Sequence, residues 1–210
     1  MHLTSLLALA ALAAASPLNF NARRGSLPTP VSVATAKVYL AELEVAPPVT
    51  DPPYTRTSFR HWITINGKCD TRETVLKRDA TADVTLDSEC KTTAGAWISD
   101  YDGVPIVGAP MVDIDHIVPL NEAWGAGAWN WTAERRKDFA NDLVRPQLVA
   151  VPAGARSNRM KADKDPSRWM PSNLSYRCTY VRAWIQVKQF YGLSVDQVEK
   201  DALTKYVNGY

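Results

Sequence analysis

The spacing of apolar and polar positions along the chain predicts helices joined by short strands and irregular segments. Near the C-terminus, apolar residues recur every three or four positions, as on the buried face of a helix. Helices are predicted after Thr29-Pro30, over 71–78, 120–128, 132–140 and 157–161, from Tyr180, and after a capping box at Ser194 to Gln197. Strands are predicted at 84–86, 96–99, 111–114 and 143–151. This mixture predicts an α+β fold with a small sheet and several helices.

The N-terminus has the pattern of an export signal. Residues 6–15 are an unbroken run of Leu and Ala that is too short to form a stable membrane anchor. Small residues then precede Ser16, as a signal peptidase requires, and a dibasic pair follows at Arg23-Arg24. We therefore expect a signal peptide at 1–15, a propeptide or linker at 16–33 and a secreted domain at 34–210, with no membrane attachment. A buried N-terminal helix is the alternative.

The three cysteines fit an exported chain. Cys69 and Cys90 are spaced to close a loop of about twenty residues, a bridge worth roughly 3 kcal/mol on the chain-entropy argument, although the sequence leaves other pairings open. Cys178 is then the unpaired cysteine, and we expect a buried free thiol in a helix. Asn130 and Asn173 begin N-glycosylation sequons, which an exported chain could use.

The nearly balanced charge of the chain excludes a protein that coats nucleic acid through a large overall positive charge. The chain has 24 Lys and Arg against 22 Asp and Glu, a net charge of +2. Any site for a polyanion must therefore be a local patch. The richest local cluster of cations comprises Arg156, Arg159, Lys161, Lys164 and Arg168. We expect this basic strip to be a phosphate-binding surface, with Lys161 on the scissile or adjacent phosphate.

Three segments carry the chemistry of the sequence. They are Asp113 to Leu120, which reads Asp-Ile-Asp-His-Ile-Val-Pro-Leu, Asn141-Asp142-Leu143, and Ser157 to Lys161. This set resembles the HNH nuclease motif, with Asn158 in place of the last His. The wider sequence, from Phe59 onward, is similar to secreted HNH endonucleases related to the C-terminal domain of GmrSD-type restriction enzymes. The resemblance implies a ββα-metal core within the α+β fold.

The residue types suit phosphodiester hydrolysis. A neutral imidazole can take a proton from water at physiological pH, so His116 is the expected general base. Asp115 and Asn158 offer one charged and one neutral oxygen, which suit Mg²⁺ or Mn²⁺. In the family pattern, the position of Asn141 completes the catalytic set by bracing a loop through hydrogen bonds. Asp113 lies two residues before Asp115 and either supports the metal site or caps the strand.

Other residues have weaker assignments. Arg159, together with Arg60 and Arg72, which match charged positions of the family, is expected to bind substrate, and Glu73 to bind or support it. His61 has no motif partner, so we expect a structural histidine. Trp124 belongs to the core or stacks on a base.

These observations predict a secreted, metal-dependent endonuclease with little sequence preference. No sequence-reading module accompanies the motif. We expect a monomer that acts on nucleic acid, with DNA favoured over RNA. A catalytically silent secreted protein that keeps the fold to bind a partner is the alternative. A serine hydrolase is disfavoured because no Gly-x-Ser-x-Gly elbow occurs.

Overall fold

The computed structural model describes residues 27–154 and 157–210. Over these residues the chain is an α+β protein in which helices surround four two-stranded antiparallel sheets. The predicted signal peptide, residues 16–26 of the predicted propeptide or linker, and Arg156 of the basic strip lie outside the described residues. Within the described ranges, no helix has the length and apolar character needed to cross a bilayer.

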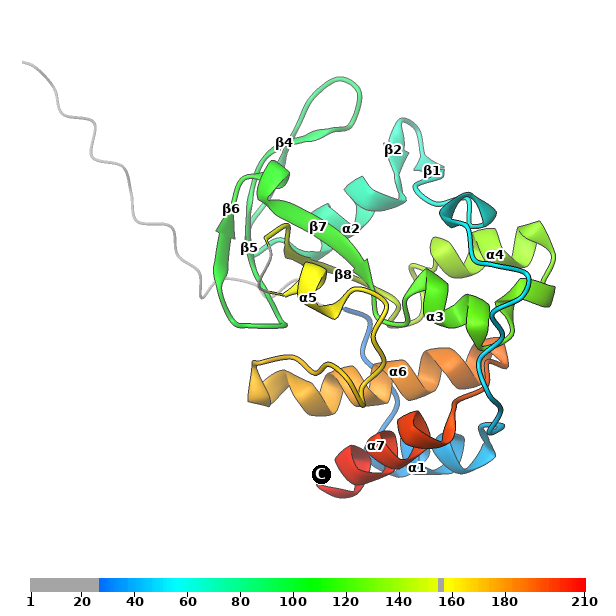
Figure 1. The fold of residues 1–210 in the computed structure, drawn as a ribbon. Coiled ribbons are helices and arrows are strands. Elements are labelled where there is room, and N and C mark those ends of the chain that lie inside the picture. Colours follow the sequence, from blue (N-terminus) through cyan, green and yellow to red (C-terminus); the bar gives the residue numbers. More distant parts are fainter. Residues whose placement is uncertain (1–26, 155–156) are drawn as a thin grey trace, which may run out of the picture.

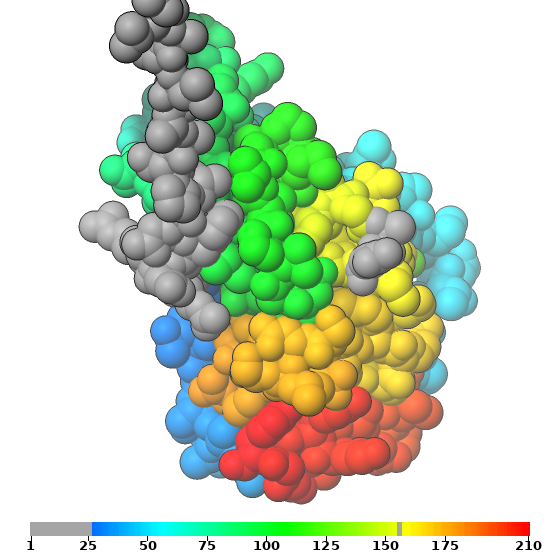
Figure 2. Space-filling view, turned by 90° about the vertical axis from the view of Figure 1, so that its left-hand side faces the viewer, coloured from blue at the N-terminus to red at the C-terminus, as the bar shows by residue number. Residues whose placement is uncertain are grey.

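Three long helices form one layer of the molecule (Figure 1). They are α1 (Val33–Glu42), α6 (Arg177–Tyr191) and α7 (Gln197–Asn208). Helix α6 crosses the middle of the molecule, with α1 and α7 packed below it, and Trp184 on α6 is completely buried. Figure 2 shows this layer from the side, with the green and yellow segments above it.

The helix starts follow local capping. Asp70 accepts the backbone N–H of Glu73 at 2.8 Å at the start of α2 (Thr71–Asp79), which confirms the helix predicted at 71–78. Thr132 caps α4 (Ala133–Ala140) as predicted. Helix α1 begins after Ser32, a few residues later than predicted, because the Ser32 hydroxyl accepts a backbone N–H of the first turn.

Helix α7 corrects the prediction of a capping box at Ser194. The carboxylate of Asp196 accepts the backbone N–H of Glu199 at 2.8 Å, so the helix begins two residues later than the predicted box implies. The hydroxyl of Ser194 instead donates to the carbonyl of Ala126 at 3.2 Å. The same sequence spacing occurs twice in succession here, and the carboxylate is the group that caps the helix.

Short elements connect these helices. The remaining paired strands are β1 (Thr64–Asn66) with β2 (Cys69–Asp70), β3 (Thr85–Leu86) with β4 (Thr92–Ala94), and β5 (Ala96–Ile98) with β6 (Pro105–Val107). The remaining helical segments are η1 (Arg56–Ser58), η2 (Ala109–Met111), α3 (Leu120–Gly125), η3 (Ala128–Asn130) and η4 (Leu174–Tyr176). The helix predicted at 120–128 is thus two pieces, separated at Gly127, which has a φ of 129°.

The predicted pairing of Cys69 with Cys90 is confirmed. Cys69 and Cys90 form a disulfide that joins β2 to the segment before β4, with their Cα atoms 5.1 Å apart. Cys178 is free, as predicted. The expectation that its thiol is buried is wrong, because Cys178 lies in the first turn of α6 and is only half-buried.

A strand–strand–helix unit lies above α6. Strand β7 (Val112–His116) pairs antiparallel with β8 (Leu148–Pro152), His116 opposite Leu148, and α5 (Asn158–Lys161) follows. The strand predicted at 143–151 begins only at Leu148. Before it, the Asp142 carboxylate accepts the backbone N–H groups of Val144 and Arg145, which holds a turn in place of a strand.

Strand β8 is buried on both of its faces. Leu148 and Ala150 of β8 pack into a small core with α2 and β5, whereas Val149 and Val151 pack into the large core around α6. Successive side chains of a strand point to opposite faces, so a single strand serves both cores. The chain segment that carries Asp115 and His116 is therefore held from two sides.

Candidate active site

One pocket gathers the central residues of the motif. Its volume is about 220 Å³, and Asp115, His116 and Asn158 all contribute to its wall. The other lining residues are Tyr54, Arg56, Ile114, Pro119, Leu120, Ala162 and Asp163. Residues from the end of β7 and the start of α5 thus meet here, across more than forty positions of sequence.

The ring of His116 is buried and held in one tautomer. Its Nε2 lies 2.9 Å from the backbone carbonyl oxygen of Ala140. A carbonyl only accepts, so Nε2 carries the proton and Nδ1 of the neutral ring is an acceptor. Burial lowers the pKa of His116 to about 3, more than the Ala140 carbonyl raises it. The imidazole is therefore neutral, with a free base nitrogen, at physiological pH.

Two side chains contact the same carboxylate oxygen of Asp115. The hydroxyl of Tyr101 donates to Oδ2 at 2.5 Å, and the ammonium of Lys161 lies 2.9 Å from the same atom. Burial raises the pKa of Asp115, against the opposing effects of Lys161 and Tyr101. The backbone N–H of His116 also donates to the carboxylate and lowers its pKa. The Asp115 carboxylate lines the pocket, where a ligand can contact it.

Lys161 corrects the sequence interpretation. Its side chain is completely buried, and its ammonium also donates to the backbone carbonyl of His116 at 2.8 Å. A side chain in this position cannot reach a phosphate on the surface, so the predicted substrate contact is wrong. Lys161 instead ties α5 to the end of β7.

Asn158 faces the other carboxylate of the strand. Asp113 and Asp115 share one face of β7, and α5 lies over that face with Asn158 opposite Asp113 and Lys161 opposite Asp115. The amide nitrogen of Asn158 donates to Oδ2 of Asp113 at 3.3 Å. This bond orients the amide, leaving the carbonyl oxygen of Asn158 for the pocket. Asp113 thus contacts a residue of the pocket wall.

Asn141 makes four hydrogen bonds with backbone and side-chain groups. Its oxygen accepts from the Ile63 N–H at 3.2 Å and the Thr71 hydroxyl at 2.7 Å. Its nitrogen donates to the carbonyls of Arg60 at 2.8 Å and Lys137 at 2.7 Å. The amide is fully engaged and is absent from the pocket wall. This arrangement matches the bracing role that the resemblance implied.

The segment braced by Asn141 presents Trp62 to the site. The indole stacks on the His116 ring with centroids 5.8 Å apart and planes inclined by 26°. Trp62 adopts a φ of 57°, which a non-glycine residue rarely takes without support from its surroundings. Sequence reasoning missed Trp62 and Tyr101, because neither lies in a motif and only the folded chain brings them to β7.

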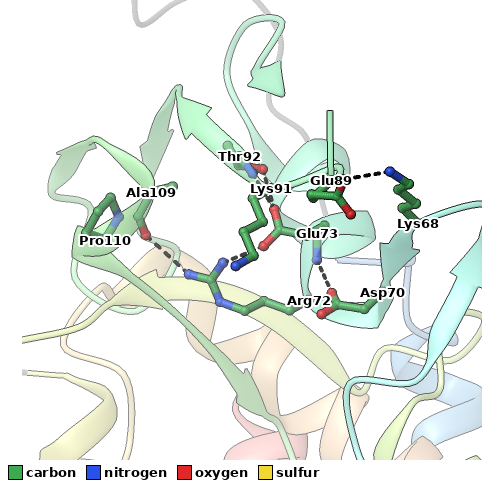
Figure 3. A pocket seen from close by; sticks show the side chains of 9 residues that line it. All are labelled: Lys68, Asp70, Arg72, Glu73, Glu89, Lys91, Thr92, Ala109 and Pro110. Carbon is green, nitrogen blue, oxygen red and sulfur yellow. Dashed lines mark hydrogen bonds and ion pairs between the residues drawn. The ribbon is translucent and has the colours of Figure 1, made fainter. Parts of the chain in front are cut away.

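Arg72 and Glu73 lie in a second pocket of about 360 Å³, shown in Figure 3. The guanidinium of Arg72 donates to Glu73 at 2.9 Å and to the carbonyls of Ala109 and Val112 at 3.3 and 3.0 Å. Glu73 in turn accepts the N–H and hydroxyl of Thr92. Arg72 is therefore not on the wall of the His116 pocket and instead holds α2 to the start of β7.

The remaining predicted contacts are dispersed. Arg60 and Arg159 are exposed, without a side-chain partner among the described residues, and neither lines the pocket. Arg168 is paired with Asp165 at 2.7 Å. The basic strip is therefore not a continuous row of free cations. Trp124 is buried in the aromatic core, so the alternative of a base-stacking surface is wrong for it.

The two sequons differ in accessibility. Asn130 is exposed. Asn173 is half-buried, and its amide nitrogen donates to the carbonyl of Asp100 at 3.0 Å. Its amide oxygen accepts from the Ser175 hydroxyl at 2.8 Å. Of the two, Asn130 is the one that the fold leaves open to a glycan.

Comparisons with known proteins agree with these features. The family described as "GmrSD restriction endonucleases, C-terminal domain" matches residues 58–206. An "Uncharacterized secreted protein" from Arthroderma benhamiae is 47% identical over 200 residues, which cover 94% of this chain and 97% of that relative. No solved structure matches the chain significantly.

The family match spans the strand–strand–helix unit and every residue of the pocket wall except Tyr54 and Arg56. It agrees closely with the region, Phe59 onward, over which the sequence resemblance extends. It relates the chain to nucleases. The chain belongs to the family of the C-terminal domain of GmrSD restriction endonucleases.

Proposed function

We propose that this protein is a secreted, divalent-cation-dependent endonuclease that hydrolyses phosphodiester bonds of nucleic acid with low sequence specificity. The observation that carries the proposal is the position of His116. Its Nε2 is tied to the Ala140 carbonyl, which leaves Nδ1 as the acceptor nitrogen, and the ring shares a pocket with Asp115 and Asn158. The family relationship to restriction endonucleases supports the same reaction class.

In the proposed mechanism, Nδ1 of His116 accepts a proton from the attacking water. The Ala140 carbonyl keeps the opposite nitrogen protonated, and Trp62 limits rotation of the ring from one side. A general base held in this way contributes about 10²- to 10⁴-fold to a rate. The positive charge that forms on the ring is stabilised by the hydrogen bond to the same carbonyl.

The donor set in the pocket fits Mg²⁺ or Mn²⁺. Asp115 offers its carboxylate, and Asn158 offers a carbonyl oxygen that its bond to Asp113 orients. Two protein oxygens with water and phosphate oxygens match the preference of Mg²⁺, which keeps several waters when bound. A cation held there would neutralise charge that develops on the phosphate and the leaving oxygen.

Export is supported by two independent features. The N-terminal Leu and Ala run has the form of a signal peptide, and the Arthroderma benhamiae relative is named a secreted protein. The disulfide suits an oxidising compartment. Mass spectrometry of the protein from culture medium tests this part, with a mature N-terminus after residue 15 or after Arg24 as the expected result.

A plasmid digest tests the activity. Pure protein should cut plasmid DNA with Mg²⁺ or Mn²⁺ and fail to do so with EDTA, and a parallel RNA substrate should be cut more slowly. His116→Ala should lower the rate at least about 100-fold while its circular dichroism stays that of the wild type. Near wild-type cleavage by His116→Ala would contradict the proposal. Nucleic-acid binding without cleavage would instead support the catalytically silent alternative.

A further inference from the structure

The His116 pocket contains a cation that no motif marks. Of the residues that line it, Arg56 is the one with a positive charge. Lys161, the nearest cation of the predicted basic strip, is buried beneath the pocket in its ion pair with Asp115. Asp163, at the rim, adds a negative charge and accepts from Asn121. Among the described residues that line the pocket, a phosphate therefore meets a single side chain able to attract it by charge.

The guanidinium of Arg56 is positioned but not neutralised. Arginines such as Arg72 and Arg168 each lie beside a carboxylate, whereas Arg56 has no carboxylate partner among the described residues. Its Nη2 donates to Nε2 of His61 at 3.4 Å, and the guanidinium also hydrogen-bonds with the Tyr54 hydroxyl. The other ring nitrogen, Nδ1 of His61, donates to the Phe59 carbonyl at 2.8 Å, which makes Nε2 the acceptor. Arg56 therefore keeps N–H groups that no carboxylate of the described residues occupies.

Tyr54 adds a neutral hydroxyl to the same mouth of the pocket. Burial raises the pKa of Tyr54, and the nearby Arg56 guanidinium opposes that shift. The two side chains are therefore neighbours, Tyr54 just before η1 and Arg56 at its first position. A planar guanidinium with free N–H groups matches the oxygens of a phosphodiester in a bidentate arrangement.

We propose that Arg56, held by His61, binds a backbone phosphate of the nucleic acid at the mouth of the His116 pocket. This assignment rests on the proposed function and gives Arg56 the phosphate contact first expected of Lys161. It also gives His61 a purpose that the sequence did not indicate, because the ring orients Arg56 without cancelling its charge. The recognised chemistry is the phosphodiester itself, so the contact is independent of base sequence.

Equilibrium binding without turnover tests the assignment. Fluorescence anisotropy with a labelled duplex DNA, from about 50 to about 200 mM NaCl, gives both affinity and salt slope. The experiment uses His116→Ala with Mg²⁺ and, as a second background, the wild-type protein in EDTA. Arg56→Ala should weaken binding about tenfold and reduce the slope of log K against log salt by about 0.9. Arg56→Lys should keep the slope, because the charge remains, and still weaken binding.

Lys37→Ala is the matched control. Lys37 is exposed on α1, outside the pocket, and its removal changes the net charge by the same amount. It should alter affinity less than twofold. Equal effects of Arg56→Ala and Lys37→Ala would overturn the assignment, even if the plasmid digest shows metal-dependent cleavage. Selective loss with Arg56→Ala would support it, even if the digest shows no cleavage and the proposed reaction fails.

Discussion

The ammonium of Lys161 lies 2.9 Å from Oδ2 of Asp115, and the side chain of Lys161 is completely buried. The two residues belong to α5 and β7, so the pair fastens the helix onto the strand that ends in His116. Tyr101 donates to the same oxygen. Lysine side chains usually lie on the protein surface, whereas the ammonium of Lys161 is buried inside the candidate site.

Breaking this ion pair should destabilise the protein. Lys161→Met keeps the length of the side chain and leaves the Asp115 carboxylate buried without its cation. Loss of one partner of a buried pair costs about 3–5 kcal/mol. Urea unfolding at neutral pH should show a fall of this size in the free energy of unfolding.

Two further variants distinguish loss of the Lys161–Asp115 ion pair from the general effect of removing a lysine. Lys205→Met, at an exposed position of α7, should change stability by less than about 0.5 kcal/mol. In the double variant Asp115→Asn with Lys161→Met, no unpaired charge remains, so the loss should be smaller than the sum of the single losses. Wild-type stability of Lys161→Met would contradict the role of the pair.

Asp113 should control cation binding without contacting the cation. Asp113→Ala frees the amide of Asn158, which then has no fixed orientation. Loss of such an outer hydrogen bond lowers metal affinity about 10- to 100-fold. Calorimetric titration of Mn²⁺ into the folded protein measures this directly, without any substrate.

Asp138→Ala provides the matched control, because Asp138 is exposed on α4 and its removal makes the same charge change. Asn158→Ala should weaken Mn²⁺ binding at least as much as Asp113→Ala. If Mn²⁺ affinity is unchanged in both Asp113→Ala and Asn158→Ala, the cation ligands lie elsewhere.

Local sequence signals predicted much of the fold. A capping residue acts within its own turn, so Asp70 and Thr132 revealed the starts of α2 and α4. The meeting of Asp115, His116 and Asn158 was also expected, because the resemblance to the HNH motif implied a ββα unit that brings them together. The structure places all three on the wall of one pocket.

The surroundings of that centre depend on longer-range packing. Arg56 and Trp62 lie more than fifty residues before His116, and their segment is held near it by long-range contacts such as the bonds from Asn141 and from Arg136 to Ser58. Lys161 was misassigned because a count of nearby charges does not show which side of a four-residue helix faces a buried carboxylate. Such contacts are set by the tertiary structure.

Glu199 should give stability a pH dependence near neutrality. Burial raises its pKa to about 7, more than Lys188 lowers it, and Glu122 shares the same ammonium. A carboxyl whose pKa is higher in the folded state contributes stability that is intact below about 4.5 and is lost as pH rises through about 7. The loss should be on the order of 1–3 kcal/mol.

Glu199→Gln removes the titrating group and keeps a polar side chain near Trp184 and Lys188. Urea unfolding between pH 4.5 and about 8 should show a decline in the wild type that is largely absent from Glu199→Gln. Glu134→Gln, at an exposed position of α4, should leave the decline unchanged. Identical profiles for wild type and Glu199→Gln would contradict the assignment.

Asn141 should act on catalysis through the segment it braces. Asn141→Ala removes all four hydrogen bonds and leaves buried groups unpaired, which should cost about 2 kcal/mol or more. Asn141→Asp keeps the acceptor for the Ile63 N–H and loses only the donations to Arg60 and Lys137. Hydrogen exchange of the Ile63 amide should therefore accelerate more in Asn141→Ala than in Asn141→Asp.

Both variants should cleave nucleic acid more slowly although His116 is intact, because Trp62 no longer fixes the face of the imidazole. Asn66→Asp, at an exposed position in β1, should alter neither exchange at Ile63 nor the rate. Replacing a catalytic group that contacts substrate would lower the cleavage rate without changing hydrogen exchange at Ile63. If Asn141→Ala abolished cleavage while exchange at Ile63 stayed at the wild-type rate, Asn141 would act on the substrate directly and the bracing role would be wrong.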